Sequence, residues 1–177
     1  METGEHHEWA LEFEELYPTM GPLLKADQRM LVLGCGNSTF SEKLYDTGYH
    51  KITNIDSIEE VIEYMRSQHL PTRPHMEWAT MDATKLSFPD NHFDVVFDKT
   101  LLDCLMCATD YQAKVTAFFK EAKRVGKQGG LYISVTINPK VEDVAQHITE
   151  HLSQPKIIQI TGKQGHLFHF LHVNINK

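Results

Sequence analysis

A short apolar segment that ends in two closely spaced glycines is the feature that most constrains this chain. Residues 30–33 read Met-Leu-Val-Leu, and Gly34-Cys35-Gly36-Asn37-Ser38 follows directly, before a helix-like segment from Thr39 to Asp46. This order predicts a buried strand, a glycine turn and a helix N-terminus, where the backbone can approach a ligand and offers unpaired N–H groups. A tight turn that binds nothing has the same local sequence, so the rest of the chain has to distinguish the two.

Length and composition indicate an ordinary globular protein. The 177 residues are predicted to form a single domain over residues 1–177, in which residues 1–25 form an N-terminal helical lid segment. No apolar run is long enough to cross a bilayer, the acidic N-terminus has no signal-peptide core, and three cysteines argue against a disulfide framework. We therefore expect a cytoplasmic location.

The charge is unevenly distributed along the chain. Residues 1–110 contain 20 Asp or Glu and 8 Lys or Arg, whereas residues 111–177 contain 4 and 9. The acidic first part disfavours general nucleic-acid binding, which needs a basic surface. It suits a basic partner such as a lysine-bearing protein segment, although a solubilising surface is the more ordinary explanation.

Strand-like and helix-like segments alternate along the chain. Strands are predicted at 51–56, 76–81, 93–97 and 131–137, and helices at 59–69, 110–125 and 141–152, with a helix stop at 127–130. An N-terminal helical segment at 8–24 is cut by Pro18 and Pro22. The last two strands, 156–161 and 167–175, are joined by a link too short for a crossover helix, so they should be antiparallel. The pattern predicts a doubly wound, Rossmann-like α/β fold with a seven-stranded sheet, mostly parallel with an antiparallel last strand, and resembles the class I methyltransferase fold.

Charged side chains stand where three of the predicted parallel strands end. Asp56 ends the second strand, Asp82 follows the third, and Asp98-Lys99 follows the fourth. In a doubly wound sheet, ligands bind beyond the carboxyl ends of the strands. Any one of these aspartates can simply cap a helix, but the set together with the glycine turn predicts a binding site.

Asp56 lies 20 residues after Gly36, a spacing that places a carboxylate on ribose hydroxyls in dinucleotide enzymes and in S-adenosylmethionine enzymes alike. Three other observations favour S-adenosylmethionine over a dinucleotide as the ligand. Thr39 stands where a dinucleotide enzyme usually needs a third glycine, and Asp82-Ala83 suits the amino-bearing edge of adenine. The antiparallel terminal pair is also unusual for a dinucleotide domain. The predicted cofactor-binding set within these segments is Gly34, Cys35, Gly36, Asn37, Asp56, Ser57, Asp82 and Ala83.

Several separate blocks of the chain resemble one family. They are Leu33-Gly34-Cys35-Gly36-Asn37-Ser38, Leu44-Tyr45-Asp46-x-Gly48-Tyr49, Asn54-Ile55-Asp56, Met81-Asp82, Leu86-x-Phe88-Pro89-Asp90 and Phe93-Asp94-Val95-Val96-x-Asp98-Lys99. Together they resemble methyltransferase-like 13 and its relatives, which include lysine methyltransferases of translation elongation factor 1-alpha. The resemblance implies that Gly34 and its neighbours contact the methionine part of the cofactor, Asp56 the ribose, and Asp82 and Ala83 the adenine. It further implies that Lys99 lies beside the methionine end and that Trp9 covers the cofactor.

The chain departs from this family at two places. The family usually reads Asp-Lys-Gly-Thr-Leu-Asp after the fourth strand, and here the residues are Asp98-Lys99-Thr100-Leu101-Leu102-Asp103. His7 stands where an aromatic residue is common, and an upstream Tyr-Trp-Asp segment is missing, as expected of a truncated or divergent form. These differences concern the N-terminal lid and the substrate pocket more than the cofactor site.

The resemblance implies an S-adenosylmethionine-dependent transferase, and we expect a protein-lysine N-methyltransferase acting on an exposed lysine of a protein such as a translation factor. Asp98 or Asp103 is expected to orient the lysine amine as the catalytic carboxylate, with Asp103 facing the substrate. A methyltransferase of small molecules or RNA, and a non-catalytic cofactor-binding module, remain open alternatives, because the glycine turn and the carboxylates would serve all three.

Three other groups of residues are not expected to bind metal. His147-Ile-Thr-Glu150-His151 has the spacing of a zinc peptidase, but no third ligand follows. Cys104-x-x-Cys107 has no second pair, and both cysteines are expected to be buried on a helix. His166, His169 and His172 lie on a predicted strand, where alternation points His169 away from the other two.

Overall fold

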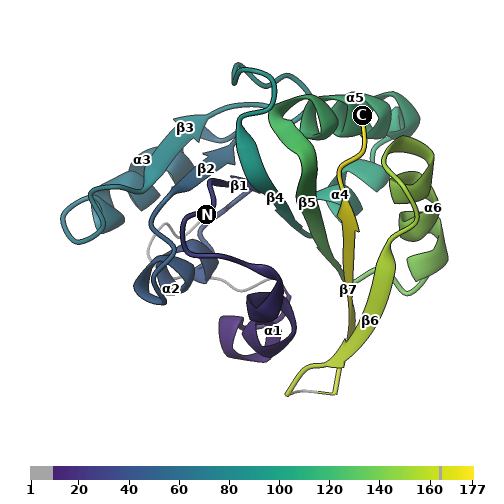
Figure 1. Ribbon diagram of the computed structural model, residues 1–177, viewed down its shortest axis with the longest axis horizontal. Coiled ribbons are helices and arrows are strands. Elements are labelled where there is room, and N and C mark those ends of the chain that lie inside the picture. The colour runs from purple at the N-terminus through teal and green to yellow at the C-terminus, as the bar shows by residue number, and fades with distance from the viewer. Residues whose placement is uncertain (1–9, 164) are drawn as a thin grey trace.

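The computed structural model describes residues 10–163 and 165–177 (Figure 1). Within them, seven strands form one sheet in the order β3-β2-β1-β4-β5-β7-β6. The strands are β1 Met30–Leu33, β2 Ile52–Asp56, β3 Glu77–Thr80, β4 Phe93–Lys99, β5 Gly126–Thr136, β6 Lys156–Thr161 and β7 Leu167–Asn174. Among these described strands, β7 runs antiparallel to both of its neighbours, β5 and β6, and the other six strands are parallel to one another. The predicted seven-stranded, mostly parallel sheet is confirmed.

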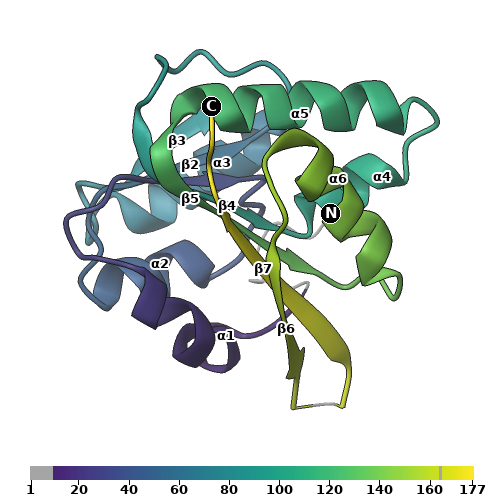
Figure 2. The ribbon, with the colours of Figure 1, turned by 45° about the vertical axis from the view of Figure 1, so that its right-hand side comes forward.

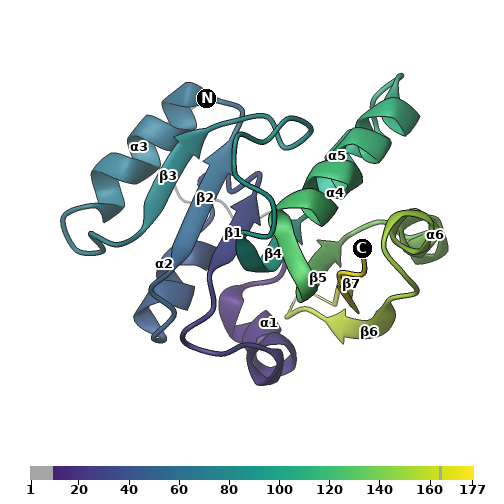
Figure 3. The same cartoon turned by 45° about the horizontal axis from the view of Figure 1, so that its top comes forward.

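Helices cover both faces of this sheet. They are α1 Phe13–Met20, α2 Phe40–Asp46, α3 Glu59–His69, α4 Leu101–Met106, α5 Tyr111–Val125 and α6 Val141–His151, with a 3-10 turn, η1, at Gly21–Leu23. One apolar core lies between the sheet and α1, α2 and α3, and a second lies between the sheet and α4, α5 and α6. Figure 2 shows α4, α5 and α6 on one side of the sheet and α1 and α2 on the other. Figure 3 shows β3 and β6 at opposite edges.

The central position of β1 brings the ends of three strands together. All four residues of β1 are buried, as expected of a short apolar strand covered on both faces. Leu33, its last residue, pairs with Ile55 of β2 and with Asp98 of β4. Because these strands are parallel, the residues at their ends meet at one edge of the sheet, which we call the carboxyl edge. Gly34 therefore lies between Asp56 and Lys99.

Two predicted boundaries were wrong. Pro18 lies inside α1 and does not end it. β5 begins at Gly126, which pairs with Phe93 of β4, and it runs through 127–130, the segment expected to be a helix stop. Within that segment, Gly129 and Gly130 exchange backbone hydrogen bonds with Ile175 at 2.8 and 2.7 Å. A pairing partner that far along the chain cannot be recognised from local sequence.

No helix among the described residues is long and apolar enough to span a membrane.

Candidate functional site

The glycine turn after β1 is held by the carboxylate at the end of β2. Gly34 and Gly36 have φ angles of 61° and 52°, a region that residues with a Cβ rarely adopt. The Gly36 N–H donates to Asp56 Oδ2 at 2.9 Å, and the Ile58 N–H donates to Asp56 Oδ1 at 3.0 Å. Asp56 therefore orients both the turn and the start of the segment that leads into α3.

A mostly apolar cavity of about 460 Å³ opens at this turn. It is lined from the ends of β1, β2, β4 and β5 and from α2 and α4. Its lining residues are Val32, Leu33, Gly34, Cys35, Gly36, Ser38, Phe40, Ser41, Asp56, Ile58, Lys99, Thr100, Leu101, Asp103, Cys104, Cys107 and Ile137. Six of the residues predicted from the sequence are among them, namely Gly34, Cys35, Gly36, Asp56, Lys99 and Asp103. The size and the apolar walls with few polar groups are typical of a small-molecule site.

Other predicted site residues lie outside this lining. Asp82 stands at the same edge, because the Met81 N–H donates to the Asp56 carbonyl at 2.8 Å, but its exposed carboxylate accepts bonds from the N–H and the hydroxyl of Thr84. Ala83 is buried in the apolar core under α5. Asn37 and the exposed Ser57 flank lining residues without lining the cavity themselves. Trp9 falls outside the described residues.

The two predicted catalytic carboxylates occupy different environments. Asp98 has no exposed surface; its Oδ1 accepts the N–H groups of Leu101 and Leu102, and its Oδ2 accepts the hydroxyls of Tyr132 and Ser134. Burial, with a contribution from the nearby carboxylate of Asp103, raises the pKa of Asp98 to about 7. The expectation that Asp98 contacts the acceptor amine therefore does not agree with its position, since it anchors α4 to β5 beneath the cavity.

Asp103 faces the cavity from α4. Its carboxylate is half-buried and accepts hydrogen bonds from the Thr136 hydroxyl and from the Ile137 N–H, both at the end of β5. Burial raises the pKa of Asp103, and these hydrogen bonds oppose the shift. Of the two predicted catalytic carboxylates, Asp103 is thus the one that lines the cavity and that a ligand there can reach.

The cavity wall contributed by α4 differs from expectation. Cys104 and Cys107 were predicted to be buried on a helix; Cys104 lies on α4 and Cys107 caps it, but both are exposed toward the cavity side. The prediction of burial was wrong because α4 buries Leu102 and turns its cysteines away from the core. Cys35 is buried, and burial raises the pKa of its thiol far above the usual value.

Several lining residues were missed by sequence reasoning. Thr100 has a φ of 68° at the start of α4, and the Leu101 side chain lies against Gly34. Thr100 and Ile137 directly follow β4 and β5, so the rule that ligands bind beyond strand ends would have identified both. Leu101 begins α4 and carries no such signal, because apolar residues are found everywhere in a fold.

Comparison with known proteins places this geometry in one family. Residues 31–134 match a family model described as a methyltransferase domain. An eEF1A lysine and N-terminal methyltransferase of Bos taurus is 40% identical over 166 residues, which cover 90% of this chain and 24% of the relative. The corresponding Mus musculus protein is 40% identical over 134 residues, and the matched region is 19% of its length. The chain thus spans about a fifth of the length of these relatives. EEF1A lysine methyltransferase 4 of Bos taurus is 32% identical over 93% of this chain and 67% of its own length.

Solved structures share the fold. The N-methyltransferase NodS of Bradyrhizobium japonicum, solved with S-adenosyl-L-homocysteine, superposes with a TM-score of 0.76 at 17% identity, covering 99% of this chain and 95% of NodS. A SAM-dependent methyltransferase of Methanosarcina mazei gives a TM-score of 0.73 at 18% identity, covering 92% and 99%. At such identities the likeness concerns the fold alone. Taken with the matched family model and the relatives, it leads to one conclusion: this chain belongs to the family of class I, S-adenosylmethionine-dependent methyltransferases.

Proposed function

We propose that this chain transfers a methyl group from S-adenosylmethionine to the side-chain amine of a lysine in a protein, with elongation factor 1-alpha or a similar protein as the acceptor. The observation that carries the proposal is the shared cavity at the carboxyl edge, where the glycine turn, Asp56 and Asp103 meet. The names of the relatives, which describe methyltransferases of eEF1A lysine, support the class of acceptor.

The residues present fit the cofactor. A Cβ at Gly36 would meet nothing within 4 Å, so the turn leaves room for a ligand against the backbone. Asp56 would accept hydrogen bonds from the ribose hydroxyls, and Phe40 and Leu101 would contact the aliphatic part. The Asp82 carboxylate and the backbone N–H of Ala83 would recognise the adenine. When bound, S-adenosylmethionine supplies a methyl group activated by a positively charged sulfur.

The chain's own contribution to the reaction is to orient a neutral amine. A lysine has a reference pKa of about 10.4, so it must lose a proton before it can act as a nucleophile. The apolar side chains of Leu101 and Ile137 would desolvate the ammonium and lower its pKa. Asp103, held by Thr136 and Ile137, would accept a hydrogen bond from the amine and fix its direction.

An acidic surface beside the cavity suits a basic protein segment. Glu59 and Glu60 begin α3 directly after Ile58, which lines the cavity, and both are exposed. Their charge would favour encounter with a lysine-bearing segment at low ionic strength.

Transfer of a labelled methyl group tests the proposal. The purified chain is incubated with methyl-labelled S-adenosylmethionine and either purified elongation factor 1-alpha or a cell lysate separated into protein, RNA and small-molecule fractions. Label is expected in protein, on lysine. Label in RNA or in the small-molecule fraction instead would replace the proposed acceptor, and cofactor binding without transfer to any fraction would indicate a non-catalytic module.

A pair of variants tests the role of Asp103. Asp103→Asn is expected to lower the rate of transfer at least about tenfold, since a hydrogen bond to a charged group contributes roughly 1.5–3 kcal/mol. Asp110→Asn, an exposed aspartate seven residues further along that pairs with Lys114, is the matched control and should retain the wild-type rate. An undiminished rate in Asp103→Asn would remove this carboxylate from the proposal.

A further inference from the structure

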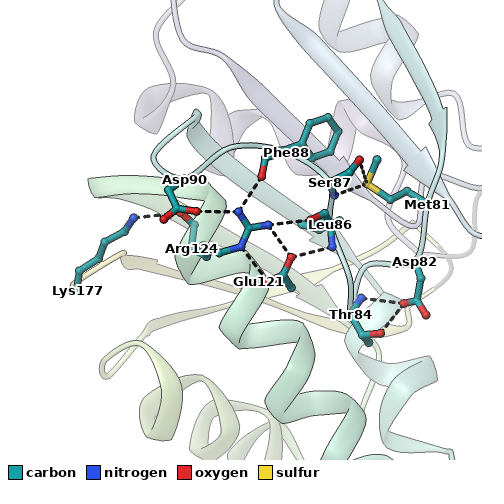
Figure 4. Close-up of polar contacts among 10 residues, drawn as sticks. All are labelled: Met81, Asp82, Thr84, Leu86, Ser87, Phe88, Asp90, Glu121, Arg124 and Lys177. Atoms are coloured by element: carbon teal, nitrogen blue, oxygen red, sulfur yellow. Dashed lines mark hydrogen bonds and ion pairs between the residues drawn. The ribbon is translucent and has the colours of Figure 1, made fainter.

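The loop between β3 and β4 is held by one arginine near the end of α5 (Figure 4). Arg124 Nη1 donates to the Phe88 carbonyl at 2.7 Å, and Nη2 donates to the Leu86 carbonyl at 2.8 Å. Nη1 also donates to Asp90 Oδ1 at 2.8 Å. The Arg124 carbonyl in turn accepts the Asn91 N–H at 3.0 Å. A single residue thus fixes the backbone of the loop at several points between 86 and 91.

Glu121, one turn earlier on α5, completes the contact. Its carboxylate accepts hydrogen bonds from Arg124 Nε at 2.9 Å and from Arg124 Nη2 at 2.7 Å. This bidentate pairing fixes the plane of the guanidinium. Glu121 Oε2 also accepts the Leu86 N–H at 2.7 Å. The side chains of Arg124 and Glu121 are 28% and 14% exposed, so the pair is only partly screened by water. The hydrogen bond from Arg124 is the main cause that lowers the pKa of Glu121.

The loop held in this way begins with the turn that carries Asp82. Met81, just before Asp82, is bonded to the Asp56 carbonyl at the end of β2. Leu86 lies four residues after Asp82; its N–H donates to Glu121, and its carbonyl accepts from Arg124. The turn is therefore anchored at one end to the strand that carries Asp56, and at the other end to α5. Figure 4 shows Asp82 and Thr84 on the same loop as these contacts.

We propose that Arg124, oriented by Glu121, is a positioning residue that places Asp82 to recognise the amino group of adenine. The inference rests on the proposed S-adenosylmethionine site and adds a determinant of base specificity to it. An arginine suits this task because its planar fork holds two backbone carbonyls at once, which fixes an irregular loop more rigidly than apolar contact or a lysine would.

S-adenosylhomocysteine and its deaminated analogue provide the test. S-adenosylhomocysteine carries an amine at position 6 of the base, whereas S-inosylhomocysteine carries a carbonyl oxygen there, which cannot donate to the Asp82 carboxylate, and an N–H at position 1. Calorimetry should show that the wild-type chain prefers the adenosine compound by about tenfold or more, as expected for loss of a charge-assisted hydrogen bond. Arg124→Gln should reduce the preference to less than about threefold, chiefly by weakening binding of the adenosine compound.

Three further variants distinguish the effect of the guanidinium geometry from the effect of its charge and from a loss of stability. Lys120→Gln removes the same charge from an exposed position on α5 and should retain the wild-type preference. Arg124→Lys keeps the charge without the fork and should lose most of the preference. Glu121→Gln should lose part of it. Arg124→Lys and Glu121→Gln also test the inference if Arg124→Gln does not fold, as judged by the absence of a cooperative thermal transition.

The outcomes distinguish this inference from the proposed function. Absence of any binding of S-adenosylhomocysteine by the wild-type chain would overturn the proposed function, and the inference with it. A wild-type preference that survives intact in both Arg124 variants would overturn the inference alone. The inference would also be overturned if the Arg124 variants lost affinity equally for both compounds, because a purely structural role of Arg124 gives that result.

Discussion

The Asp56 carboxylate accepts a hydrogen bond from the Gly36 N–H at 2.9 Å, across 20 residues of sequence. This bond joins the end of β2 to the turn after β1 and leaves Asp56 on the cavity wall. One side chain therefore both shapes the proposed cofactor site and contributes a charged acceptor to it.

Replacing Asp56 should weaken cofactor binding more than it weakens the fold. Asp56→Asn keeps one oxygen for the backbone but loses the charge that would bind the ribose. Affinity for S-adenosylhomocysteine, measured by calorimetry, should fall at least about tenfold, since a hydrogen bond to a charged group contributes roughly 1.5–3 kcal/mol. Asp27→Asn, an exposed position outside the cavity lining, should bind normally. Unchanged affinity in Asp56→Asn would contradict the assignment of Asp56.

Gly34 cannot accept a side chain without strain. Its φ is +61°, and a Cβ would approach the side chain of Leu101 to 3.1 Å. Gly34→Ala is expected to lower the free energy of unfolding by about 1–2 kcal/mol, as measured in urea, and to weaken cofactor binding as Leu101 moves. Gly48→Ala provides the comparison, because Gly48 has a φ of +112° with no atom within 4 Å of its Cβ position. That variant should lose stability and keep its cofactor affinity.

Thr100 adopts a left-handed conformation that a β-branched residue rarely takes, with a φ of 68°. The family that the chain resembles usually has glycine at this position. Relief of the strain in Thr100→Gly should contribute about 1–2 kcal/mol, partly offset by about 0.5–1 kcal/mol of glycine entropy in the unfolded chain. A small net rise in the urea midpoint is expected. Thr100→Val keeps the β-branch and should give no rise; if it stabilises equally, strain is not the cause.

The buried Asp98 should give stability a specific pH dependence. Its pKa is raised from 3.8 to about 7, so between these values the folded chain holds a proton that the unfolded chain has released. The Asp98 contribution to the free energy of unfolding is therefore fully present below pH 3.8 and is lost as pH rises through about 7. Asp98→Asn should remove this decline when urea midpoints at pH 5 and pH 8 are compared.

Asp46 provides the control for that comparison. The hydrogen bond from Arg73 lowers the pKa of Asp46 below 3.8, so Asp46 is ionised in both states across the range measured. Asp46→Asn should leave the slope between pH 5 and pH 8 unchanged. A slope that persists in Asp98→Asn would show that another group is responsible.

The three cysteines report on occupancy of the cavity, because all of them line it and only Cys35 is buried. Iodoacetamide should modify Cys104 and Cys107 in the native chain and leave Cys35 unmodified, as followed by mass spectrometry. Burial raises the pKa of Cys104, so its rate should increase with pH. Saturating S-adenosylhomocysteine should slow both reactions. Equal rates with and without it would place the cofactor elsewhere.

Local patterns in the sequence were sufficient for much of the fold. The apolar strand at 30–33, the glycine turn and the helix at 59–69 were predicted at their observed positions, because each depends on neighbouring residues alone. The parallel order of β1, β2 and β3 followed from the helices between them, whereas β3 and β4 are joined by a loop. The spacing of Gly36 and Asp56 correctly predicted that they lie together.

By itself, then, the sequence determined the alternation of strands and helices, the glycine turn and the family to which the chain belongs. Only the tertiary structure decided which polar residues reach the cavity. Asp98 and Asp103 are equally plausible in sequence, but Asp98 is enclosed by hydroxyls 34 and 36 residues away, on β5. Arg124 likewise meets Leu86 and Phe88 across 38 and 36 residues. Burial and hydrogen bonding depend on segments that meet only when the chain folds, and no local pattern contains that information.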